Sequence, residues 1–333
     1  MKRTLQRLLC LGLVLGAVLS LPGCSPQPTA SATPGAVKIP YRAVATTGMV
    51  ADIVKAVGGE RANVQALIGE GVDPHLFKPT RADVARLAEA DIVFYSGHLL
   101  EGKMTDVLTK VGEHRPVHAV TDAIEPAYIL EPPEFAGHPD PHIWMDVKGW
   151  IEAVKVVRDA LIAYDPAGKE LYEKNSEAYL GQLAALDEYA RTAFASVPKE
   201  RRVLVTAHDA FNYMGRAYDL EVKGIQGLST ESEAGLADLN RLVAFLVDKK
   251  IEAVFVETSV AEKNVQALIE GARSRGANVK IGGKLFSDAM GAPGTYEGTY
   301  IGMIDHNVTT IVRALGGQAP EKGYQGKLTG GPK

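Results

Sequence analysis

The feature that most constrains the fold is an alternation of short β-like runs with amphipathic helical stretches, which begins at Tyr41 and occurs twice. The candidate strands lie at 42–47, 63–68, 91–96 and 116–120, and then at 202–207, 221–226, 252–257 and 278–283. The segments between them carry apolar residues at helical spacing. Strands that alternate with helices are typical of mostly parallel sheets covered on both faces. The pattern therefore predicts an α/β fold with two lobes, each a mostly parallel four-stranded sheet flanked by helices.

A single long helix is predicted between the two sets, over residues 165–198. Asp165 is a suitable N-cap and Pro166 a suitable first helical residue. From Tyr172 to Ala193, apolar and aromatic residues recur at steps of three, four and seven. A helix of about 30 residues is roughly 45 Å long. We therefore expect an N-terminal lobe, a stiff linking helix, a C-terminal lobe and a flexible tail, at 41–164, 165–198, 199–318 and 319–333.

The N-terminus has the layout of a secretory signal peptide, which we assign to residues 1–23. Lys2, Arg3 and Arg7 precede an apolar run over 8–21 that is too short to span a membrane comfortably. The run ends in Leu-Pro-Gly-Cys, which resembles a bacterial lipobox, although Pro22 is unusual there. Cleavage before Cys24 would leave a lipid anchor on that thiol and hold the protein on a membrane surface. A plain secretory signal with an incidental cysteine is the alternative.

The mature chain would begin with a tether at 24–40, which is rich in Pro, Ser, Thr and Ala. Loss of residues 1–23 removes three basic residues and no acids, so the formal net charge changes from −4 to −4 − 3 = −7. The only cysteine besides Cys24 is Cys10, inside the apolar run, so the exported domain must fold without an intrachain disulfide. The absence of a basic stripe with interleaved aromatics argues against nucleic acid as a partner.

Three histidines share one context, since each follows a strand or turn and opens a loop that leads into a helix. They are His75, His142 and His208, and Asp288 follows a strand in the same way. Ligands of open α/β sheets bind beyond the carboxyl ends of the strands. Imidazole suits Zn²⁺, and a carboxylate ligand widens the choice toward Mn²⁺. Local zinc-finger spacing is absent, so spacing alone favours loop or capping histidines over metal ligands.

Five motifs in order resemble the TroA-like group, the zinc- or manganese-binding solute-binding lipoproteins of bacterial ABC importers. They are DPHLFKPTRADV, DPHIWMD, VLVTAHDAFNYMGRAYDL, AVFVETSVAEKNVQAL and LFSDAMGAPGTYEGTYIGMIDHNVTTIV, and the resemblance covers nearly all of 41–318. It implies two α/β lobes bridged by one long helix, with the metal buried between them. It also implies the ligand set His75, His142, His208 and Asp288.

The resemblance also bears on the metal. Members that favour manganese or iron often have Glu at the third ligand position, and zinc-binding members often have His. His208 therefore favours Zn²⁺ over Mn²⁺, with one ion per chain as the transported ligand. Zinc specialists often carry a long His-rich loop before the second ligand, whereas this chain has only His138 there. Manganese therefore stays open.

Further residues near the ligands have two interpretations each. Glu257 ends a strand and is a candidate to orient a ligating imidazole through its other ring nitrogen, or to form a salt bridge. Asp73, Asp140 and Asp209 flank the ligands and either orient them or cap turns. The remaining histidines, His98, His114, His118 and His306, are interpreted as structural.

The function implied by the resemblance is that of a non-catalytic carrier. It would capture the metal outside the cytoplasmic membrane and deliver it, as a monomer, to the permease and ATPase of an ABC importer. Four protein ligands leave no position for a reacting water. The alternatives are a secreted zinc hydrolase that uses Glu257 or Glu231 as general base, for which no HExxH motif is present, and a surface adhesin.

Overall fold

Short parallel strands and amphipathic helices alternate along the chain, as the sequence pattern predicts. The computed structural model describes residues 37–135 and 137–329, which belong to one compact unit beginning at Val37. The expected signal peptide, the Cys24 anchor and residues 25–36 of the expected tether lie outside the described residues.

All eight expected strands are present, each within two residues of its predicted position. The strands are β1 (Tyr41–Ala45), β2 (Ala62–Ala66), β3 (Ile92–Tyr95), β4 (Val117–Ala119), β5 (Val203–His208), β6 (Glu221–Gln226), β7 (Ala253–Glu257) and β8 (Lys280–Leu285). The helices are α1 (Gly48–Gly58), α2 (Arg81–Glu89), α3 (Thr105–Gly112), α4 (Val147–Tyr164), α5 (Lys169–Ala195), α6 (Asn212–Tyr218), α7 (Leu236–Asp248), α8 (Lys263–Ser274) and α9 (Tyr300–Ala314).

The strands of the N-terminal half form one parallel sheet in the order β2-β1-β3-β4. Ala43 of β1 pairs with Val64 of β2 on one side and with Ile92 of β3 on the other. Because the strands are parallel, their carboxyl ends meet at one edge of the sheet. The loop that carries His75 leaves β2 at this edge and ends where Thr80 and Asp83 form a capping box at the start of α2.

The C-terminal half departs from the predicted single four-stranded sheet. Its strands form two parallel hydrogen-bonded pairs, β5-β6 and β7-β8, and β5 and β7 lie side by side without joining one ladder. A side chain occupies the place of a ladder bond at the end of β5. The backbone N–H of His208 donates to Oε1 of Glu257 at 2.9 Å instead of to a strand carbonyl. The fold class is still the predicted one, parallel strands flanked by helices.

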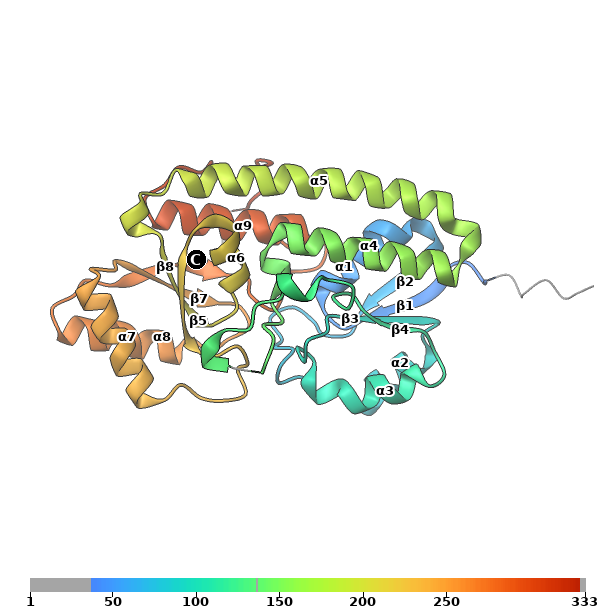
Figure 1. Cartoon of the computed structure of the whole chain (residues 1–333), viewed down its shortest axis with the longest axis horizontal. Helices are drawn as coiled ribbons and strands as arrows, with labels where there is room; N and C mark the ends of the chain where they lie inside the picture. Colours follow the sequence, from blue (N-terminus) through green and yellow to red (C-terminus); the bar gives the residue numbers. More distant parts are fainter. Residues whose placement is uncertain (1–36, 136, 330–333) are drawn as a thin grey trace, which may run out of the picture. The chain divides into compact units, whose positions relative to one another are not determined.

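One long helix, α5, runs along the molecule beside α1, α4 and α9 (Figure 1). It has 27 residues, fewer than expected, because Pro166–Gly168 form a separate 3-10 turn. Its predicted face is buried, including Tyr172, Leu183 and Leu186. These residues belong to a single apolar core that extends from β1 to α9. The two halves thus share one core on the helix side.

Two smaller apolar cores lie away from α5. The first contains Val44, Leu87 and Leu108 and packs β1 and β3 against α2 and α3. The second contains Leu246 and Leu268 and packs β5 and β7 against α7 and α8. Each half therefore has its own core on the side opposite α5.

The segment after α9 packs on the body as far as it is described, where a flexible tail was expected. Leu328 is buried, and the backbone N–H groups of Tyr324 and Thr329 donate to Asp305 at 2.8 Å and to Glu297 at 3.1 Å. The residue boundaries proposed for the lobes remain predictions.

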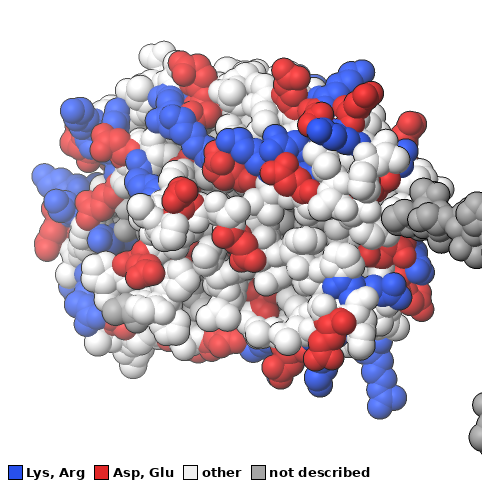
Figure 2. Space-filling view, turned by 45° about the vertical axis from the view of Figure 1, so that its right-hand side comes forward, with Lys and Arg blue, Asp and Glu red and all other residues white. Residues whose placement is uncertain are grey.

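The surface drawn in Figure 2 carries acidic and basic side chains interspersed with one another. None of the helices in the described ranges combines the length and the apolar character that crossing a membrane requires.

Candidate metal centre

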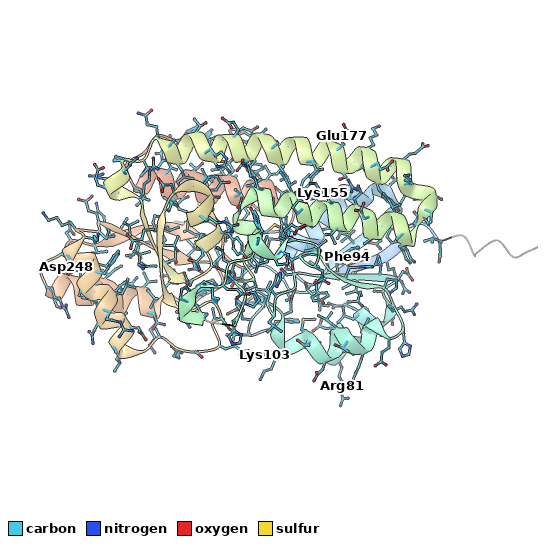
Figure 3. All side chains as sticks on the ribbon, in the orientation of Figure 1. Arg81, Phe94, Lys103, Lys155, Glu177 and Asp248 are labelled. Atoms are coloured by element: carbon cyan, nitrogen blue, oxygen red, sulfur yellow. The ribbon has the colours of Figure 1, made fainter. Side chains whose placement is uncertain are left out.

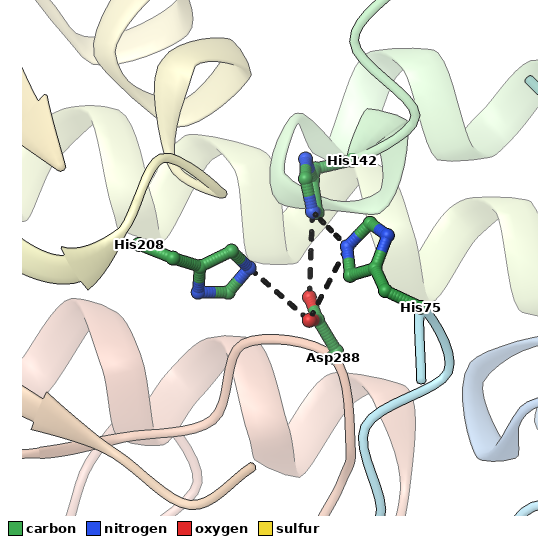
Figure 4. Close-up of side chains that lie close together, drawn as sticks. All are labelled: His75, His142, His208 and Asp288. Carbon is green, nitrogen blue, oxygen red and sulfur yellow. Dashed lines mark hydrogen bonds and ion pairs between the residues drawn. The ribbon is translucent and has the colours of Figure 1, made fainter. Parts of the chain in front are cut away.

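Four side chains from separate loops and strands converge at one buried point (Figure 4). His75 comes from the loop after β2, and His142 precedes the 3-10 turn Ile143–Met145. His208 is the last residue of β5, and Asp288 lies in the loop after β8. One ligand atom from each residue lies within 4.8 Å of all the others. The structure therefore brings together the four residues that the resemblance implied, two from each half.

The distances within the cluster centre on the Asp288 carboxylate. Its Oδ2 lies 3.1 Å from Nε2 of His208 and 3.7 Å from Nε2 of His75. Its Oδ1 lies 3.5 Å from Nε2 of His142, and the Nε2 atoms of His75 and His142 are 3.3 Å apart. All three imidazoles thus point the same ring nitrogen at one carboxylate.

The cluster contains polar atoms that are buried without a hydrogen-bond partner in the described part of the chain. These atoms are Nε2 of His208 and both carboxylate oxygens of Asp288. The side chains of His142, His208 and Asp288 are 0% exposed. An unsatisfied buried polar group destabilises the fold, and a buried charge more so. A cation coordinated by these atoms would satisfy all of them, so the donor set fits a divalent metal.

Asp140 holds His142 at two points. One oxygen, Oδ1, lies 2.7 Å from Nδ1 of the ring and also accepts from the backbone N–H of His142 at 2.9 Å. Its Oδ2 accepts from Nδ2 of Asn212 at 3.0 Å. A carboxylate on Nδ1 favours the tautomer whose Nε2 carries a free lone pair, and this pair points into the cluster.

Glu257 holds His208 in the same way. Its Oε2 lies 2.5 Å from Nδ1 of the ring, and its Oε1 accepts the backbone N–H. Glu257 ends β7 beside the end of β5, so the contact follows from the adjacency of the two strands. The structure thus brings Glu257 to the imidazole that it was a candidate to orient.

His75 is the least restrained of the three imidazoles. Asp73 accepts its backbone N–H at 2.8 Å, but no described residue forms a hydrogen bond to its ring Nδ1. His75 is also the one member of the cluster that lines a cavity of about 770 Å³, which Phe135, His138 and Gly227 line as well. The ring with the weakest support therefore borders this cavity.

The electrostatics of the cluster favour positive charge at its centre. Burial lowers the pKa of His75 to about 3, so this ring is neutral. Burial also opposes charge on His208, but the carboxylates of Asp288 and Glu257 outweigh it and raise the pKa of His208 well above its usual value. Burial alone would raise the pKa of Asp288, yet His208, His142 and His75 hold it below its usual range. A carboxylate held this strongly in its charged form is a suitable metal ligand.

The other histidines stand outside the described cluster. His118 stacks on Phe94, and Nε2 of His306 lies 2.8 Å from the carbonyl oxygen of Lys284. His98 has a φ of 49° in the loop after β3. Asp209 also lies apart from the ligating atoms and carries a pKa raised by burial.

Sequence reasoning missed two residues that support the site. Oγ1 of Thr230 donates to Oδ2 of Asp73 at 2.5 Å, and Nε1 of Trp144 donates to the carbonyl oxygen of Ser287 at 2.9 Å. Thr230 lies in the loop after β6, at the carboxyl end of a parallel strand, and that position was the available signal. Trp144 belongs to the quoted DPHIWMD motif but carries no ligand chemistry of its own.

Two parallel α/β halves are joined by a long helix, and three imidazoles and a carboxylate are buried between them. This combination defines the class of metal-binding solute-binding proteins. The family model described as "Zinc-uptake complex component A periplasmic" matches residues 43–314. The chain belongs to this family of metal-binding substrate-binding proteins, which confirms the resemblance found in the sequence.

Individual relatives are similar over most of their length. Manganese-binding lipoprotein MntA of Bacillus subtilis is 45% identical over 91% of this chain and 97% of its own. Zinc-binding protein TroA of Treponema pallidum is 48% identical over 82% of this chain and 88% of its own. The solved structure of the latter superposes with a TM-score of 0.81 at 47% identity, covering 83% of this chain and 99% of that one. The expected fold is thereby confirmed.

Proposed function

We propose that this chain captures one divalent transition metal ion outside the cytoplasmic membrane and delivers it to the permease of an ABC importer. The ligands are His75, His142, His208 and Asp288. The observation that carries the proposal is the convergence of four donor groups within 4.8 Å, with both Asp288 oxygens buried and unpartnered in the described part of the chain. Such a cluster is costly to the fold unless a cation occupies it.

Zinc is the ion that we favour. Three imidazoles and one carboxylate match the four-coordinate, nitrogen-rich sites of Zn²⁺, whereas Mn²⁺ prefers more oxygen ligands. Among the relatives, one is named for manganese and another for zinc at similar identity. Most nitrogen and oxygen sites bind zinc more tightly than manganese, so tight zinc binding alone does not establish which ion the protein carries. The preference for zinc over manganese must therefore be measured with both ions in direct competition.

A carrier role also fits better than a hydrolase. Four protein ligands complete a tetrahedral shell and leave no position for an activated water. Glu257, one candidate general base, uses both oxygens on His208. Glu231, the other, lies 3.1 Å from Nζ of Lys103 in a solvent-exposed ion pair.

We further propose that a lipid on Cys24 holds the mature chain at the outer face of the cytoplasmic membrane, where it works as a monomer with the permease and its ATPase. The support is the lipobox-like run before Cys24 and the lipoprotein names of several relatives. Replacing Cys24 with Ala should release the protein from the membrane fraction. Retention in that fraction would contradict the anchor.

The decisive experiment is a competitive titration of the metal-stripped protein with Zn²⁺ and Mn²⁺, followed by thermal unfolding. One equivalent of zinc should raise the melting temperature, because an ion that binds only the folded state stabilises it by mass action. Asp288→Ala should weaken zinc binding by more than about 100-fold, since loss of outer partners alone costs 10–100-fold.

Asp248→Ala is the matched control, because Asp248 is an exposed aspartate at the end of α7 (Figure 3). It should bind zinc like the unaltered chain. Unchanged affinity in Asp288→Ala would refute the four-ligand site.

A further inference from the structure

Two loops from opposite halves meet beside His75. One loop follows β2 and carries Asp73 and His75, and the other follows β6 and carries Thr230. Oγ1 of Thr230 donates to Oδ2 of Asp73 at 2.5 Å, and Oδ1 of the same carboxylate accepts the backbone N–H of His75 at 2.8 Å. A single carboxylate therefore connects the C-terminal half to a metal ligand of the N-terminal half.

This connection acts on the ligand that has least other support. The rings of His142 and His208 are held through Nδ1 by Asp140 and Glu257. The described residues provide no such bond for the ring of His75, which also borders the 770 Å³ cavity. The position of His75 therefore depends on its backbone, and its backbone depends on Asp73.

We propose that the Thr230–Asp73 hydrogen bond is a latch that holds His75 in its ligating position and sets how fast the bound ion leaves. The inference rests on the proposed function, since it concerns the same metal. With the latch formed, the carboxylate of Asp73 is fixed from both sides. With the latch broken, Asp73 loses its bond to the C-terminal half, and His75 can swing toward the cavity. Thr230 is thus a positioning residue that never touches the ion.

A second contact between the two halves, from the turn after β3 to the loop after β6, is much weaker. Lys103 lies 3.1 Å from Glu231, but their side chains are 30% and 49% exposed. Exposed ion pairs contribute little because solvent screens them. Thr230 is 8% exposed, and its bond to a carboxylate is charge-assisted. Because Thr230 is buried and Glu231 is exposed, we assign the latch to Thr230 and not to Glu231.

Contacts within and beside the loop after β6 fix the conformation that positions Thr230. Nε2 of Gln226 donates to the carbonyl oxygen of Ser232 at 3.1 Å and so braces the turn from within. At its start, Gly227 lies against the ring of Phe135, where an added Cβ would be 2.6 Å from the ring. A loop preorganised in this way loses little entropy when the latch closes.

The test is the rate at which zinc leaves the full-length protein when a chromogenic chelator is added in excess. Thr230→Val removes the hydroxyl at constant shape and should speed zinc dissociation by roughly tenfold, as expected for one hydrogen bond to a charged group. Thr230→Ser keeps the hydroxyl and should restore the slow rate. Thr105→Val is the matched control, because among the described residues the Thr105 hydroxyl bonds only to the carbonyl of Gly102, and it should leave the rate unchanged.

Glu231→Gln tests the exposed pair and should change the rate by less than about twofold. The zinc stoichiometry and association rate of Thr230→Val should match those of the unaltered chain, because its four ligands are intact. A lower stoichiometry would mean that Thr230 merely supports folding, and would overturn the latch. Thr230→Ala provides a second hydroxyl-free variant with the same expectation.

Two outcomes distinguish a failure of the proposed latch from a failure of the proposed carrier function. An unaltered zinc dissociation rate in both Thr230→Val and Thr230→Ala overturns the latch and leaves the carrier function standing. Failure of the unaltered chain to bind zinc or manganese overturns both.

Discussion

The two halves of this protein are joined in two different ways. On the helix side, α1, α4, α5 and α9 share one apolar core that passes from one half to the other without interruption. On the loop side, the described contacts near the site include single polar pairs, Thr230 with Asp73 and Lys103 with Glu231. The first junction is held by close packing of a continuous core, whereas beside His75 the halves are joined by single polar bonds.

This difference indicates where the molecule can move. Opening the helix side would expose large apolar surface, at roughly 25 cal/mol for each Å². Opening the loop side costs a few hydrogen bonds, each worth about 1 kcal/mol net. Loop movement around a nearly rigid helical frame is therefore the cheapest way to admit or release an ion.

The largest expected effect comes from a cavity on the helix side. Leu183 lies on α5 and is fully buried in the shared core. Leu183→Ala should lower the free energy of unfolding by about 2–5 kcal/mol, measured by urea denaturation. Zinc affinity of the folded variant should be unchanged.

The same substitution at Leu236 is the matched control. Leu236 is 81% exposed at the start of α7, so Leu236→Ala should leave stability within about 0.5 kcal/mol. If Leu183→Ala weakened zinc binding as much as stability, the two junctions would not be independent.

A smaller effect, specific to the site, is expected at Glu257. Glu257→Gln replaces the carboxylate that accepts from Nδ1 of His208 with a weaker neutral acceptor. Zinc affinity, measured by chelator competition, should fall by about 10–100-fold. Glu177→Gln, on the exposed face of α5, should bind zinc normally (Figure 3). Equal affinities for the two variants would mean that Glu257 has no role in orienting His208.

The helix side also contains the buried carboxylate of Asp165, whose contribution depends on pH. Asp165, between α4 and α5, accepts from Nε of Arg61 at 2.6 Å and from the hydroxyl of Tyr172 at 2.5 Å. The hydrogen bond from Arg61 holds the pKa of Asp165 below its usual value, with further help from Tyr172. Asp165→Asn should therefore cost about 2 kcal/mol at neutral pH.

The sign of the pH dependence follows from the depressed pKa. The carboxylate stabilises the fold fully above its unfolded pKa of about 3.9, and this stabilisation is lost as the pH falls through the folded value. The stability difference between the unaltered chain and Asp165→Asn should therefore be constant from neutral pH down to about pH 5 and shrink below about pH 4. Urea midpoints across this range measure it. A difference that disappeared already near neutral pH would contradict the assignment.

The smallest effect expected is a change in amide hydrogen exchange when zinc binds. Protection should rise in the loops after β2 and β6, which meet at the site, and stay constant along α5. Zinc-dependent protection spread along α5 would show that the helix side moves as well.

The sequence alone predicts a large part of this architecture. The pattern located all eight strands, because short β-like runs alternate with longer segments that carry apolar residues at helical spacing. His208 and Asp288 could be proposed because each stands at or just after a strand end, where parallel strands direct their loops to one edge. The closeness of Glu257 to His208 follows from the same rule.

Other features depend on contacts that no local pattern encodes. The C-terminal strands form two pairs, with a side-chain bond between β5 and β7 at the end of β5, and strand periodicity does not report this. Thr230 and Asp73 are 157 residues apart, and although Thr230 follows a strand end, nothing local in the sequence pairs it with Asp73. The same holds for Tyr41 and Tyr172, whose hydroxyls meet 3.1 Å apart across 131 residues.

The position of α9 in the chain has a consequence for synthesis. Proteins are made from the N-terminus, and α9 and Asp288 come near the end. A nascent chain that stops before residue 285 has three of the imidazoles but lacks the carboxylate at the centre of the cluster and the last helix of the shared core. Folding and metal capacity are therefore completed together, by residues 288–314 near the end of the described chain, so unfinished chains should hold the ion more weakly than the finished protein.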